Sequence, residues 1–110
     1  MDRTLEQEIN TLHAQVCGAL ADPKRIMIIY ELADGPKNVT DLTKLLVLPQ
    51  SLVSRHLKVL RERGIVAATR KGPSVEYCLT DVRLVKALDL LRAVLHDNLW
   101  HRAELVTQLE

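Results

Sequence analysis

A short polar stretch, PQSLVSRHLKVLRERG over residues 49–64, places hydroxyl, amide, imidazole and guanidinium groups at the start of one amphipathic segment. Apolar residues recur within it at helical spacing, and a glycine follows, so we expect a helix that ends in a left-handed residue. Polar side chains off the apolar stripe point outward, where amides, hydroxyls and guanidinium groups can hydrogen-bond the edges of DNA bases. The stretch therefore predicts a DNA-reading surface whose candidate base-contacting residues are Gln50, Ser51, Ser54, Arg55 and His56, over a buried stripe of Val53, Leu57 and Leu60. The alternative for the serines is helix capping or ordinary surface filling, and a structural role is equally open for His56.

Positive charge is concentrated in the same part of the chain. Residues 49–71 carry six lysines and arginines and one glutamate, whereas the other 87 residues carry nine cations and thirteen anions. A local positive patch on a mildly acidic body is typical of a surface that binds a polyanion, although a charged stretch can also be a plain solvated helix face. The candidates for phosphate contacts are Lys58 and Arg61 in the expected helix, and Arg70 and Lys71 beyond it.

Four further helices are predicted by apolar residues that recur at helical spacing. They cover residues 5–20, 23–33, 39–46 and 81–105. Residues suited to N-capping precede three of them: Asp22 before Pro23, Asn38, and Thr80 with Asp81. The expected inward residues of the third are Val39, Leu42, Leu45 and Leu46. The first and the last of these helices carry apolar stripes that a single chain of this length cannot wholly bury. The stripe of the first helix is Leu5, Ile9, Leu12, Val16 and Leu20, and that of the last is Val82, Val85, Leu88, Leu91, Leu95 and Leu99.

Between residues 65 and 80 the apolar period changes from that of a helix to that of a strand. The runs IVAATR and VEYCLT flank KGPS, which predicts a hairpin with Gly72 and Pro73 at its tip. Three short helices followed by such a hairpin match a winged helix-turn-helix, in which the second helix of the motif enters the DNA major groove. We therefore expect a mainly α fold of about five helices with a two-stranded wing, forming one domain over residues 1–110.

The chain resembles the ArsR/SmtB family of small dimeric repressors over nearly its whole length. LADPKRIMIIYELADG looks like the second helix of that family, PQSLVSRHLKVLRERGIV like its recognition helix, and RKGPSVEYCLTD like its wing. The resemblance implies DNA contacts at the residues proposed above, and a homodimer built by residues 5–20 and 81–105. Two departures stand in the turn before the recognition helix, where the family often has glycine and serine and this chain has Val47 and Pro49. Because a β-branched residue tolerates a left-handed conformation poorly, we expect a slightly different turn geometry.

Family members release DNA when they bind a metal or when a thiol pair is modified, and the ligand sets of the family do not match here. The third helix, NVTDLTKLL, has no cysteine pair for a thiophilic metal. In the zinc site of the last helix Asp81 fits, but Arg83 and Val94 stand where the family has histidine, and only Asp97 is left as a further ligand. No cofactor is predicted, so the inducing signal is either of another kind or absent.

Two other sets of residues are possible sensors. His13 and Cys17 lie four residues apart on the first helix, while Asp97, His101 and Glu104 share a face of the last. If these helices meet across a dimer, a metal site can form; otherwise Cys17 is a small core residue and the histidines are solvated. Cys17 and Cys78 are also candidates for oxidation, Cys78 because it lies opposite the inward face of its strand.

Several function classes are excluded or disfavoured. The sequence holds no glycine-rich phosphate loop, no HExxH motif and no arrangement of Ser, His and Asp suited to catalysis, so we do not expect an enzyme. It holds no long apolar run and no signal peptide, so we expect a cytoplasmic protein without a membrane partner. The predicted function is a sequence-specific regulator of transcription, a dimeric repressor bound to a double-stranded DNA operator. The alternative is a winged helix that binds another protein, because the fold alone does not establish DNA binding.

Overall fold

The computed structural model describes the backbone over residues 1–109 and the side chains of residues 1–102 and 104. Its helices are α1 (Arg3–Leu12), which continues through a π-helical turn η1 (His13–Cys17), then α2 (Pro23–Ala33), α3 (Val39–Leu46), α4 (Gln50–Glu62) and α5 (Arg83–Leu109). Its strands are β1 (Lys37–Asn38), β2 (Val66–Lys71) and β3 (Ser74–Leu79). Five helices and a hairpin confirm the mainly α, winged helix-turn-helix prediction. Among the described residues, no helix is both long enough and apolar enough to span a membrane.

The strands form one antiparallel sheet in the order β1-β3-β2. Strands β2 and β3 make the predicted hairpin, in which Val66 is paired with Leu79 and Lys71 with Ser74, and Gly72 at the tip has a φ of 60°. The prediction of a two-stranded sheet missed β1, whose Lys37 is paired with Tyr77. A strand of two residues is too short to produce a period in the sequence, which is why the pattern did not reveal it.

The core lies where α2, α3 and α4 pack on one another and on the base of the wing. Because the chain has no phenylalanine, this core consists of aliphatic side chains, nearly all of them branched. The buried apolar residues are Ala19, Ile28, Ile29, Leu32, Leu42, Val53, Leu57, Leu60, Ile65, Val66 and Leu88. The predicted stripe of α4 is confirmed, whereas Leu45 of α3, which was expected to point inward, is exposed.

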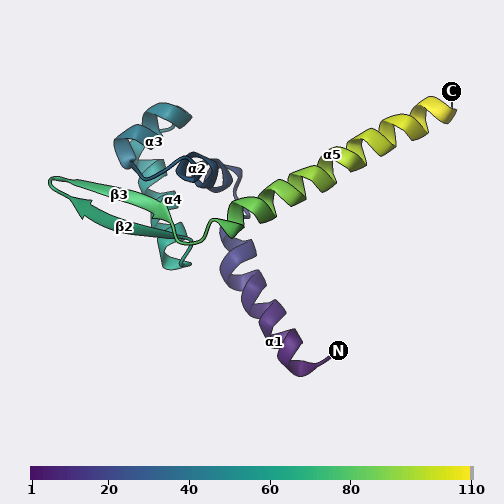
Figure 1. The fold of residues 1–110 in the computed structure, drawn as a ribbon, viewed down its shortest axis with the longest axis horizontal. Helices are drawn as coiled ribbons and strands as arrows, with labels where there is room; N and C mark the ends of the chain where they lie inside the picture. The colour runs from purple at the N-terminus through teal and green to yellow at the C-terminus, as the bar shows by residue number, and fades with distance from the viewer. Residues whose placement is uncertain (110) are drawn as a thin grey trace.

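Helices α1 and α5 extend away from this core in different directions, while the hairpin projects from the opposite side (Figure 1). No residue of α1 is buried, and of α5 only the first turns reach the core, through Leu88. The exposed apolar side chains along the two helices include Leu5, Ile9, Leu12, Leu91, Leu95 and Leu99. An exposed apolar stripe of this length on a folded chain usually marks an interface.

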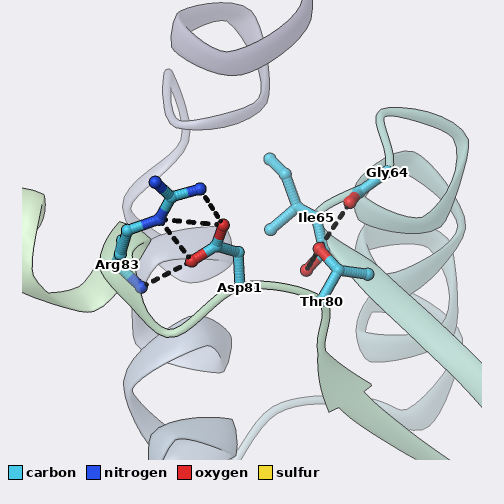
Figure 2. Close-up of polar contacts among 5 residues, drawn as sticks. All are labelled: Gly64, Ile65, Thr80, Asp81 and Arg83. Atoms are coloured by element: carbon cyan, nitrogen blue, oxygen red, sulfur yellow. Dashed lines mark hydrogen bonds and ion pairs between the residues drawn. The ribbon is translucent and has the colours of Figure 1, made fainter.

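Asp22 and Asn38 cap their helices as predicted: the Asp22 carboxylate accepts from the Lys24 N–H at 2.8 Å, and the Asn38 amide oxygen from the Asp41 N–H at 2.8 Å. At the start of α5 only part of the prediction holds. Asp81 accepts from the Arg83 N–H at 2.9 Å, but the Thr80 hydroxyl instead donates to the carbonyls of Gly64 and Ile65 (Figure 2). Thr80 thus ties the end of the wing to the loop that follows α4.

Asp81 and Arg83 also form an ion pair, with 2.7 Å between Arg83 Nη2 and Asp81 Oδ2 (Figure 2). The side-chain hydrogen bond from Arg83 lowers the pKa of the Asp81 carboxyl to about 2. Both side chains are largely in water, so the pair adds little to stability. It does hold the carboxylate in place as the N-cap of α5.

The turn between α3 and α4 contains Val47 in the left-handed conformation, with φ 54° and ψ 51°. The turn therefore forms with a left-handed residue, and valine adopts this strained conformation; a slight difference from the turn of the family stays a prediction. Among the described residues, Val47 is the one non-glycine residue with positive φ. Its side chain is 86% exposed, so packing does not offset the strain.

Replacing Val47 with glycine should therefore stabilise the fold by about 1 kcal/mol, because the left-handed strain of a non-glycine residue is about 1–2 kcal/mol and the added freedom of the unfolded chain offsets part of it. Urea unfolding measures the difference. The matched control is Val82→Gly, at an exposed valine whose φ is not positive, and this variant should be no more stable than the parent. If Val47→Gly is less stable than the parent, the claim that the left-handed conformation strains Val47 is wrong.

Candidate nucleic-acid interface

The predicted reading surface is one face of α4. Buried residues fill the other face, and the polar residues that were predicted to contact DNA, with the exception of His56, fall within an arc of about 140° at 100° per residue. All of them except His56 are exposed: Gln50, Ser51, Ser54, Arg55, Lys58 and Arg61. The first turns of α4 therefore offer amide, hydroxyl and guanidinium groups to solvent, and its later turns offer cations.

The wing carries the remaining two predicted contacts. Arg70 and Lys71 lie at the tip end of β2, and both are exposed. The Arg70 Nε donates to the carbonyl of Gly72 at 3.3 Å, which keeps this side chain close to the turn. Two cations at the end of a projecting hairpin can reach a phosphate backbone that lies beside α4.

His56 is buried, so the prediction that it faces outward is wrong. Its side chain is 7% exposed and points from α4 toward the start of α2. There Nδ1 lies 3.4 Å from Nη1 of Arg25, and Nε2 lies 3.9 Å from Oδ2 of Asp22. Because a guanidinium group can only donate, Nδ1 is the acceptor and the ring proton of the neutral form is on Nε2.

Burial lowers the pKa of His56 below 6.5, and the charges of Arg25, Arg55 and Lys24 act in the same direction, against the opposing effect of Asp22. The folded chain therefore binds this proton less readily than the unfolded chain. The stability that depends on neutral His56 is present above pH 6.5 and is lost as the pH falls below it.

We therefore expect the free energy of unfolding of the parent to fall as the pH drops below 6.5, and this fall to be smaller in His56→Gln, which has no titrating ring. Urea unfolding at a series of pH values measures both slopes. His96→Gln, at an exposed histidine of α5, is the matched control and should keep the slope of the parent. If the free energy of unfolding depends on pH equally in all three proteins, neutral His56 is not the source of the pH dependence.

The possible sensor residues are not brought together within one chain. His13 and Cys17 lie in η1, whereas Asp97, His101 and Glu104 lie in the distal half of α5, which diverges from α1 (Figure 1). In the part of the chain that the structure describes, no three His, Cys, Asp or Glu residues are grouped closely enough to hold a metal ion. A site shared between two copies stays a prediction. Cys17 is exposed rather than a core residue, and Cys78 is half-buried; both are free thiols.

Sequence reasoning missed two arginines. Arg25 of α2 contacts His56 and also donates to the carbonyls of Ala19 at 2.6 Å and Gly18 at 3.2 Å. Arg63, counted only as part of the positive segment, donates through Nη1 to the carbonyl of Ala14. No spacing in the sequence indicates these contacts, because they join elements that are separated along the chain.

Comparisons with known proteins agree with this geometry. Residues 22–68 match the family model described as "Bacterial regulatory protein, arsR family". Among curated relatives, the HTH-type transcriptional regulator NmtR of Mycobacterium tuberculosis is 41% identical over 88 residues, which are 80% of this chain and 72% of the relative. The arsenical resistance operon repressor of Bacillus subtilis is 39% identical over 74% of this chain and 77% of its own length.

A solved structure has the same fold. It is the homodimeric winged helix-turn-helix DNA-binding domain of a possible ArsR-family transcriptional regulator from Mycobacterium bovis, determined in solution. The TM-score is 0.76, with 24% sequence identity, and the match covers 92% of this chain and 93% of that one.

Proposed function

Since this chain belongs to the ArsR family of bacterial regulatory proteins, which are regulators of transcription and not enzymes, we propose that it acts as a homodimer that binds a specific DNA operator and represses transcription. The observation that carries the proposal is the exposed polar face of α4. Residues 1–110 act as one domain, and a protein that binds the chromosome of a bacterium works in the cytoplasm.

The reading surface is the start of α4. Ser54 and Arg55 stand exposed in its second turn, directly beside the buried Val53. In a helix-turn-helix the N-terminal residues of the second helix meet base edges. Arginine recognises guanine bidentately, and glutamine at the position of Gln50 recognises adenine in the same way. Lys58 and Arg61, further along the helix, are suited to phosphates.

Helices α1 and α5 are the proposed dimer interface. Leu91, Leu95 and Leu99 of α5 recur at helical spacing and are each more than half exposed in the single chain. A second copy packed on these stripes removes them from water, and two-fold symmetry then presents two α4 helices to DNA. A dimer predicts an operator made of two inverted half-sites.

Selection of random-sequence duplex DNA by the purified protein tests this proposal. We expect enrichment of an inverted repeat at both low and physiological salt, because base contacts select sequence while phosphate contacts do not. Equal recovery of all sequences at both salt concentrations would contradict it. That result would favour the protein-interaction module, for which the outward polar residues of α4 are not needed.

The wing should contribute affinity without sequence preference. We expect Arg70→Ala with Lys71→Ala to weaken binding to operator and random DNA alike. Each phosphate contact contributes a slope of about −0.9 to log affinity against log salt, so two wings should flatten the slope by up to about four such contributions. Fluorescence anisotropy across a salt series measures the slope. An unchanged slope would mean that the wings do not touch DNA.

A further inference from the structure

The first helix ends against the start of α2 and beside α4. After η1 it continues through residues 18–19, and its last carbonyls need partners beyond the helix; the Ala21 N–H donates to Gly18 O at 3.4 Å. The Arg25 guanidinium supplies further donors: Nε donates to Ala19 O at 2.6 Å and Nη2 to Gly18 O at 3.2 Å. A cation at a helix C-terminus also stabilises the negative end of the helix dipole.

The same guanidinium contacts α4. Its third nitrogen, Nη1, lies 3.4 Å from Nδ1 of the buried His56. His56 directly follows Arg55, which lies on the proposed reading face. Arg25 thus joins the end of the first helix to α4 through one planar group. The planar fork of an arginine fixes the direction of each donor, which a lysine ammonium does not.

A second arginine connects the first helix to the C-terminal end of α4. Arg63, at its C-cap, donates to the carbonyl of Ala14 within η1. Gly18 leaves room for this side chain: a Cβ at Gly18 would lie 3.1 Å from Nη1 of Arg63. The two arginines therefore bond neighbouring stretches of the first helix, Arg63 at Ala14 and Arg25 at Gly18 and Ala19.

These contacts matter because packing within the chain holds the first helix only at its C-terminal end, where Ala19 joins the core. No residue of α1 is buried, and Figure 1 shows it extending from the core at its C-terminal end alone. The orientation of α1 relative to α4 therefore depends on this short segment, where Ala19 is buried and the two arginines bond the carbonyls of Ala14, Gly18 and Ala19.

We infer that Arg25 and Arg63 are positioning residues that set the angle between the dimer helix and α4, and thereby the separation of the two α4 helices in the dimer. The inference rests on the proposed function, in which α1 contributes to the dimer and α4 reads DNA. Half-sites for paired recognition helices lie about 34–36 Å apart, so a fixed angle gives a sharp preference for one spacing. One added base pair shifts a half-site by about 3.4 Å and rotates it by about 35°.

The test uses the selected operator with one or two base pairs inserted or removed between its half-sites, and a duplex with one half-site. We expect the parent to lose about tenfold or more of its affinity for each altered spacing. Arg25→Lys and the double variant Arg25→Lys with Arg63→Lys should flatten this preference to about threefold, while their affinity for the single half-site stays close to that of the parent. Arg3→Lys, the same exchange at an exposed arginine near the start of α1, should keep the sharp preference.

A variant that is merely less stable loses affinity equally at every spacing, so it does not imitate the expected result. If the double variant keeps the sharp preference of the parent, the inference is wrong. If the parent itself does not discriminate between DNA sequences, the proposed function fails instead. Amide hydrogen exchange of residues 13–20 in the free protein then tests the arginine contacts separately: faster exchange in both variants supports them, and unchanged exchange overturns them.

Discussion

Leu91→Asp should convert the protein to a folded monomer and weaken operator binding by about a hundredfold or more, because two linked half-site contacts gain about 10²–10⁴ in affinity over one. Leu91 is 61% exposed in the single chain, so a carboxylate there does not disturb the core of that chain. In the dimer the same carboxylate is buried against apolar side chains, which is strongly unfavourable. Light scattering at micromolar concentration measures the mass, and circular dichroism confirms that the helices remain.

The matched control is Ala93→Asp, which places the same charge on the opposite side of α5 and should leave the dimer intact. A Leu91→Asp variant that still has the mass of a dimer would contradict the proposed interface. A variant that unfolds would show instead that Leu91 supports the single chain, contrary to its exposure.

Ser54→Ala with Arg55→Ala should reduce the preference for operator over random DNA by tenfold to about a hundredfold. One good bidentate base contact contributes about 1–3 kcal/mol of discrimination, and Arg55 stands exposed where such a contact is made. Affinity for random DNA should change far less. Anisotropy with both duplexes at the same salt concentration gives the ratio directly.

Lys58→Ala is the control for this variant, because Lys58 lies two turns further along α4 than Gln50 and is assigned to a phosphate. It should weaken both duplexes alike. If the Ser54 and Arg55 substitutions also weaken both duplexes by the same factor, these side chains contact phosphates, and the base-reading face of α4 lies elsewhere.

The elements of the fold were predictable because each has a local signal. Asp22 and Asn38 cap helices by bonding a backbone N–H two or three residues away, and the stripe of α4 repeats within the helix itself. The hairpin follows from its change of period and from Gly72. Local hydrogen bonds and periodicities are written in consecutive residues, so sequence alone contains them.

The errors arose where distant residues decide the outcome. His56 resembles its outward neighbours in sequence, but Asp22, the N-cap of α2, and Arg25 within α2 give its ring polar neighbours, which permits its burial. Thr80 likewise bonds Gly64 and Ile65 because the end of the wing passes the end of α4. Val47 adopts a strained conformation because the packing of α3 and α4 requires a left-handed residue between them. Such tertiary requirements leave no local pattern.

The candidate site likewise contains residues that a local pattern places and residues that only tertiary contacts place. Exposed positions of α4 follow from helix periodicity, so Ser54, Arg55 and Lys58 were placed correctly on the surface. The role of Arg25 and Arg63 depends on carbonyls of the first helix, and only the folded chain brings them together.

The ratio of affinities for the selected operator and for a shuffled duplex of the same composition tests the central claim most directly. At physiological ionic strength the proposed function predicts a ratio of about 10³ or more, as is typical of specific regulators. The binding should also show one dimer per duplex. A ratio near one at every salt concentration would contradict the claim that this protein reads DNA sequence.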